Sequence, residues 1–133
     1  MKINVDPNTD VGGFGYAEAG QHTLRVVSVE YKEGAKAPYL AWKVEFANPN
    51  TESSEKKEDG SNKAVGQIFE NTTLSTSSNG QFRLRQFCDA LGIEWTSELD
   101  TDEFIGLEFE AHVGLKTYQD VISNEIKKFI PKG

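Results

Sequence analysis

Large apolar side chains occupy every second position of residues 39–46, and this alternation restricts the fold more than any other feature of the chain. Successive side chains of a β-strand point to opposite faces, so alternate positions share one face. The apolar set is Leu40, Trp42, Val44 and Phe46, and the other set is Tyr39, Ala41, Lys43 and Glu45. The segment is therefore predicted to be a strand with one face on a core and the other in solvent.

The preceding segment, residues 22–32, is rich in β-branched residues, but its alternation changes phase at Val26 and Val27. A β-bulge, which inserts one extra residue into a strand, would restore the pattern at this point. Val27, Val29 and Tyr31 would then continue the inward face. The outward residues would be Arg25, Ser28, Glu30 and Lys32.

Three further strands and a helix follow from the remaining periodicities. Residues 66–74 are predicted to form a third strand, with Ile68, Thr72 and Leu74 inward. The helix has the core stripe Leu84, Phe87, Cys88 and Leu91, and Gly92 ends it. A helical turn near residues 102–105 precedes a fourth strand over 107–116 and a fifth that ends at Pro131.

The predicted order is three strands, one helix and two strands, which makes the chain mainly β. A five-stranded barrel with one helix between strands 3 and 4 is the arrangement of the OB-fold. The length of 133 residues suits one domain. We expect a flexible N-terminal arm over residues 1–19, a domain over 20–133 and a mobile loop at about 48–64, whose composition offers little to bury.

Composition narrows the function classes. One cysteine and two histidines supply neither an internal disulfide nor the usual zinc sets, so no metal and no cofactor are expected. No apolar run approaches the roughly 20 residues of a membrane helix, and no secretory signal is evident. These features favour a cytoplasmic protein without a membrane partner.

Acidity is concentrated in one segment of the chain. The net charge is -7, and residues 94–110 hold seven acids without any Lys or Arg, so the rest of the chain is neutral. One reading of this segment is an acidic protein-binding module or DNA mimic. A nuclease would take metal-binding carboxylates from Glu94, Asp100 and Asp102, but these lie in a turn-rich stretch without strand or helix framing, so an enzyme is not expected.

A family resemblance covers residues 20–131. It is carried by Gly20 with His22, the Val26-Val27 pair, residues 30–32, residues 66–71 ("GQIFEN"), the helix "LRQFCDALGI", "FIGLEFEAHVG" and "KKFIP". In order and spacing these residues resemble phage-encoded OB-fold single-stranded DNA-binding proteins. The resemblance implies sequence-tolerant binding of single-stranded DNA in phage DNA replication, recombination or repair, in the cytoplasm of the infected bacterium. The resemblance leaves two kinds of protein partner open. These are replication or recombination proteins, and a second copy of the chain in a homodimer.

The outward residues of the predicted strands suit such binding. Single strands are held by a basic groove along the backbone and by aromatic faces on which bases stack. The candidate DNA-binding residues are Arg25, Lys32, Lys36, Tyr39, Lys43, Phe69, Asn71, Arg83 and Lys116. Each also has a simpler interpretation: Tyr39 as cross-strand packing, Phe69 as core, the lysines as solvated surface, and Arg83 with Arg85 as solubilising residues of the helix. Lys56, Lys57 and Lys63 are predicted to let the 48–64 loop close over bound DNA.

Overall fold

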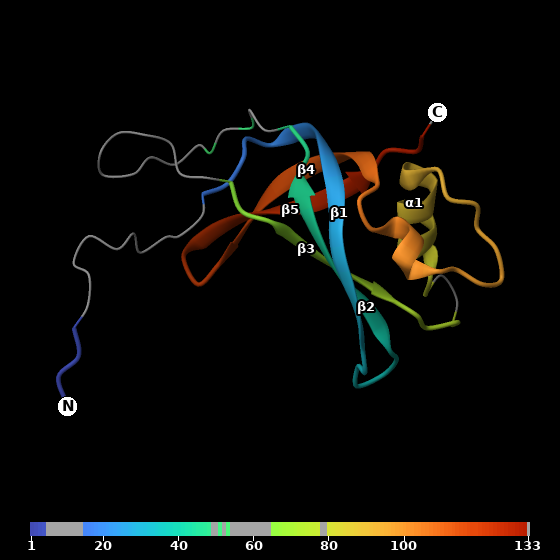
Figure 1. The fold of residues 1–133 in the computed structure, drawn as a ribbon, viewed down its shortest axis with the longest axis horizontal. Coiled ribbons are helices and arrows are strands. Elements are labelled where there is room, and N and C mark those ends of the chain that lie inside the picture. Colours follow the sequence, from blue (N-terminus) through green and yellow to red (C-terminus); the bar gives the residue numbers. More distant parts are fainter. Residues whose placement is uncertain (5–14, 49–50, 52, 54–64, 78–79, 133) are drawn as a thin grey trace.

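The computed structural model of the chain describes residues 1–4, 15–48, 51, 53, 65–77 and 80–132. Its elements are β1 (Gly20–Lys32), β2 (Tyr39–Phe46), β3 (Ile68–Thr73), α1 (Phe82–Leu91), the short 3₁₀-helix η1 (Thr101–Phe104), β4 (Glu108–Tyr118) and β5 (Val121–Phe129). Figure 1 shows α1 beside one end of the sheet, while the turn between β4 and β5 lies at the opposite end. The predicted class, mainly β with one α-helix between the third and fourth strands, is confirmed.

The five strands form one antiparallel sheet in the order β3-β2-β1-β4-β5. β1 lies at the centre, because it pairs with β2 on one side and with β4 on the other. The two edge strands, β3 and β5, contact each other, although no backbone ladder joins them in the described part of the chain. The sheet is therefore strongly bent, with its edges brought together by something other than strand pairing.

The predicted bulge in β1 is confirmed. The register with β2 shifts between Val26 and Ser28, which leaves Val27 as the extra residue. Tyr31 pairs with the buried Leu40 and so lies on the predicted inward face, but it is 58% exposed, so its burial is not as expected. Residues 30–32 are all exposed, so the β1 side of the hairpin end extends beyond the core, whereas Leu40 opposite on β2 is buried.

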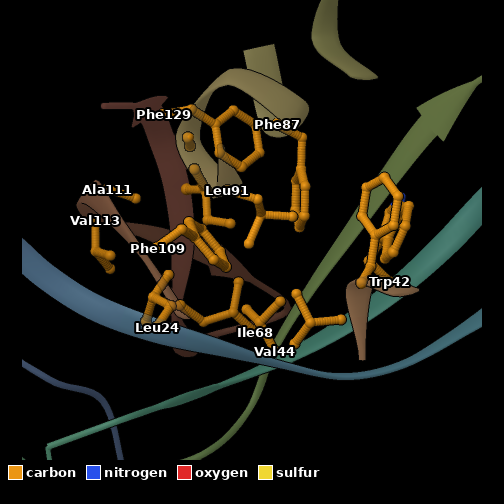
Figure 2. Packing of buried hydrophobic residues seen from close by; sticks show 14 of the residues in the cluster. Leu24, Trp42, Val44, Ile68, Phe87, Leu91, Phe109, Ala111, Val113 and Phe129 are labelled. Atoms are coloured by element: carbon orange, nitrogen blue, oxygen red, sulfur yellow. The ribbon is translucent and has the colours of Figure 1, made fainter. Parts of the chain in front are cut away.

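The core contains the apolar face of β2 and the stripe of α1, as predicted. Trp42 stacks on Phe87 with ring centroids 4.9 Å apart, and its indole N–H donates to the Thr72 hydroxyl at 2.9 Å. Phe87 in turn contacts the rings of Phe109 and Phe129 (Figure 2). This aromatic cluster attaches the helix to β2, β4 and β5.

The C-terminal end of α1 is closed by a glycine cap. Gly92 has a φ of 76°, the left-handed conformation that favours glycine, and the Ile93 amide donates to the Cys88 carbonyl at 2.9 Å.

Cys88 is buried, and burial together with the nearby Asp89 raises the pKa of its thiol to about 11. It is a core residue, in line with its place in the predicted stripe.

The apolar residues of β4 are buried only over the first part of the strand. Phe109, Ala111 and Val113 are buried, whereas Leu107 and Leu115 are 37% and 40% exposed. Leu107 precedes the strand, and the β4–β5 register shifts at His112 and Val113. Beyond this shift the hairpin extends past the core, so alternation alone overestimated the length of the buried face.

The N-terminal residues reach the sheet before β1 begins. Ala17 is fully buried, and its backbone exchanges hydrogen bonds with the Asn124 side chain at 2.8 and 3.0 Å. The predicted flexible arm therefore includes a packed segment at residues 15–17, while residues 5–14 lie outside the described residues.

Of the predicted mobile loop, the described residues are Asn48, Thr51 and Ser53, so Lys56, Lys57 and Lys63 also lie outside them. Over the described residues, no helix is both long enough and apolar enough to cross a membrane.

Candidate nucleic-acid interface

An open hollow of about 600 Å³ lies where the β1–β2 turn, β3 and the start of α1 meet. Its walls are Lys36, Ala37, Tyr39, Asn71, Thr73, Ser75, Ser77 and Arg83. Four candidate residues from the sequence, Lys36, Tyr39, Asn71 and Arg83, are thus brought to one place. They come from three separate parts of the chain, and the fold alone makes them neighbours.

Strand register and a tight turn position these walls. Tyr39 is paired with Thr73 across β2 and β3, and the Leu74 amide donates to the Pro38 carbonyl at 2.9 Å. The turn that carries Lys36 is compact, because a Cβ at Gly34 would lie 2.3 Å from the Ala37 carbonyl oxygen. Glycine at position 34 therefore permits the close approach within this turn.

Lys43 and Phe69 form a second outward feature on the same two strands. They are direct cross-strand partners, and the Lys43 ammonium lies 5.8 Å from the centre of the Phe69 ring. The Phe69 side chain is 63% exposed, so its interpretation as core is wrong. No carboxylate pairs with Lys43 or with Lys36 in the part of the chain that the structure describes.

Phe69 also borders a smaller hollow of about 190 Å³, whose other walls include Val121, Ile122 and Ser123 at the start of β5. Lys116 pairs with Ser123 across β4 and β5. The candidate Lys116 therefore belongs to the hairpin that borders this smaller hollow, rather than to the hollow around Tyr39.

Arg25 occupies a different environment. Its guanidinium binds Glu45 on β2 and Glu108 on β4, each at 3.0 Å. Hydrogen bonds to Glu45 and then to Glu108 raise the pKa of Arg25 above its ordinary value. Lys32 is similarly paired with Glu30 at 3.3 Å. These two candidates lie outside the hollow around Tyr39, and carboxylates of the protein already balance their charge.

Arg83 has both a place in the hollow and a structural role. Its Nε donates to the Glu70 carboxylate, its Nη2 donates to the Ile126 carbonyl at 2.8 Å, and its guanidinium lies 4.5 Å from the centre of the Phe129 ring. A residue of α1 thus connects β3 to β5 across the unpaired seam. Neither interpretation from sequence, phosphate contact or solubilising residue, anticipated this connection.

Sequence reasoning missed the hydroxyl wall of the hollow. Thr73, Ser75 and Ser77 line it, and the Ser75 and Ser77 hydroxyls are 2.8 Å apart. The stretch "STSSNG" joins the third strand to the helix and lacks a strand or helix periodicity of its own. Its run of hydroxyl residues directly before the helix was the available signal.

The acidic segment has divided roles. Glu108 binds Arg25, Glu110 accepts hydrogen bonds from Thr23 and Gln21, and Asp100 accepts one from the Asp102 amide. Within the described residues, no three His, Cys, Asp or Glu side chains form a group that is able to hold a metal ion. The remaining acids of the segment, Glu94, Glu98, Asp102 and Glu103, have exposed side chains.

No protein-family model matches the chain, and no curated protein matches it. Its function is therefore inferred from the residues and their geometry.

Proposed function

We propose that the chain is an OB-fold protein that binds single-stranded DNA without strict sequence preference, in phage DNA replication, recombination or repair. The OB assignment is supported by the strand order β3-β2-β1-β4-β5, by the helix between β3 and β4, and by the contact between the two edge strands. Pairing of β3 with β5 would close this sheet into a barrel.

The hollow around Tyr39 is the observation that carries the DNA-binding function. Tyr39 offers a ring, Asn71 offers amide donors and acceptors, and Lys36 offers a cation without a carboxylate partner among the described residues. Lys43 and Phe69 continue the same combination along β2 and β3. Unpaired cations beside accessible aromatic rings match the backbone and base contacts of single strands, in which each stacked base contributes about 1–3 kcal/mol.

The acidic net charge does not oppose this function. Exposed charges separated by more than the Debye length, about 8 Å at physiological salt, are largely screened from one another. What acts on a phosphate at Lys36 or Lys43 is therefore the local charge. Glu45, two positions from Lys43 on β2, is already bound by Arg25.

The test is a fluorescence anisotropy titration of labelled oligo-dT at several salt concentrations, with a duplex of equal length beside it. We expect tighter binding to the single strand and a log-log salt slope of about -0.7 for each phosphate contacted. A Lys36→Ala/Lys43→Ala double variant should bind more weakly with a flatter slope. Equal or tighter binding to the duplex would contradict the proposal.

An acidic protein-binding module or DNA mimic is the second candidate, and the exposed carboxylates of Glu94, Glu98, Asp102 and Glu103 favour it. It predicts no binding of oligo-dT at low salt, together with binding to a basic protein that normally holds DNA. Replacing these four residues with their amides would abolish that interaction. The same variant should retain, or improve, DNA binding if the first candidate is right.

A further inference from the structure

A second hollow, of about 290 Å³, adjoins the first beside the start of α1. Ser75 and Ser77 line both hollows, so the two share a wall. The other residues around the second hollow are Thr76, Gly80, Gln81, Phe82, Arg85 and Trp95. The shared wall makes the second hollow a direct continuation of the proposed DNA site.

Several local contacts hold this shared wall in place. The Gly80 amide donates to the Ser77 carbonyl at 2.8 Å, and the Gln81 side chain donates to the Leu74 carbonyl at 3.0 Å. A Cβ at Gly80 would lie 2.3 Å from the Ser75 carbonyl oxygen, so the chain approaches itself closely where glycine permits it. The wall is therefore defined by the protein before any ligand arrives.

The second hollow offers the same two kinds of group as the first. Phe82 is 59% exposed and presents a ring, while Trp95 packs partly against the core. Arg85 is exposed, and no partner for its guanidinium exists within the described residues. Arg83, two positions earlier, is held by Glu70 and the Ile126 carbonyl, so Arg85 is the guanidinium of this helix that is free to bind a phosphate.

Resting on the proposed function, we infer that a single strand bound around Tyr39 continues over Ser75 and Ser77 into the second hollow. There Phe82 stacks on a base and Arg85 binds a phosphate of the same strand. The second hollow thus lengthens the binding site past the start of α1, and an oligonucleotide that is too short to reach it gains nothing from it.

The test compares binding of dT oligonucleotides of about 4 and about 16 nucleotides, the limits of single OB-fold site sizes. The full chain should bind the long oligonucleotide more tightly than the short one. Phe82→Ala should weaken binding of the long oligonucleotide about 5- to 150-fold, the range expected for one lost stack, and leave binding of the short one unchanged. Arg85→Ala should flatten the salt slope for the long oligonucleotide by about 0.7.

Two controls make this comparison specific. Lys128 is an exposed cation on β5 that lines neither hollow, so Lys128→Ala should leave the slope for both lengths nearly unchanged. Trp95 lines the second hollow while Trp42 is buried, so binding of the long oligonucleotide should change tryptophan fluorescence. Trp95→Phe should remove that change. Melting curves of each variant establish that it is folded.

The outcomes separate the inference from the proposed function. If the short oligonucleotide binds but Phe82→Ala and Arg85→Ala bind the long one like the unmodified chain, the second hollow is not part of the site. If neither length binds the unmodified chain, the DNA-binding function itself is wrong and the inference fails with it.

Discussion

Two parts of the outward sheet surface each carry a cation, and the sequence alone does not distinguish these two cations. Over β1, Arg25 faces Glu45 and Glu108 on the two neighbouring strands. Over β2 and β3, Lys43 faces the ring of Phe69. The first cation is matched by the protein itself and the second is available to a ligand. The side chains on the neighbouring strands, rather than the cation itself, decide which part of the surface offers a cation to an anionic ligand.

The largest expected effect distinguishes the buried face of β2 from its outward face. Trp42→Ala removes the centre of the aromatic core, so the free energy of unfolding should fall by about 3–5 kcal/mol. Tyr39→Ala should leave melting near that of the unmodified chain and cost about 1–3 kcal/mol of binding to oligo-dT without changing the salt slope. If Tyr39→Ala melts the protein while a folded Trp42→Ala loses DNA, the binding face has been placed on the wrong side of the strand.

An intermediate effect is expected at Arg83, which lies in the hollow but is held by a carboxylate as Arg25 is. Arg83→Met should lower the free energy of unfolding by about 1–3 kcal/mol, because the Glu70 carboxylate, only 14% exposed, loses its partner. Chemical denaturation measures this loss, and adding Glu70→Gln should restore part of it. If Arg83→Met leaves the stability unchanged and flattens the salt slope, Arg83 is instead a DNA contact like Lys43.

The smallest effect tests the comparison itself. Lys43→Ala should flatten the log-log salt slope for oligo-dT by about 0.7, since one released counterion is lost. Arg25→Ala should leave the slope nearly unchanged, because two carboxylates already neutralise this guanidinium. Both variants are read in the same anisotropy titration. If the two variants flatten the salt slope equally, both cations contact DNA and the distinction between the two parts of the surface is wrong.

Local pattern was enough to predict most of the fold. The β2 face, the bulge at Val27 and the helix stripe ending at Gly92 each have a short-range signature, and all are present. The failures, Tyr31 and Leu115, lie at hairpin ends that project past the core. Alternation indicates which side chains share a face, but the extent of the covering layer depends on tertiary packing.

Most residues of the candidate site could be predicted from the sequence, but their arrangement in space could not. Outward parity selected Tyr39, Lys43 and Phe69 because strands have a strict period of two. It did not distinguish them from Arg25, since the pairing of Arg25 with Glu108 joins residues that are distant in the sequence. The serine wall and the seam held by Arg83 likewise depend on contacts between distant segments.

The central position of β1 has a consequence for how the chain is made. Residues 20–25 complete their hydrogen bonding only with residues 108–113, which emerge from the ribosome more than 80 residues later. Until then the sheet has β1 as an open edge, and closing so long a loop carries an entropic cost before any pairing rewards it. Such edges are where nascent chains associate wrongly. In this protein one edge of β1 therefore stays unpaired until a segment far along the chain has been synthesised.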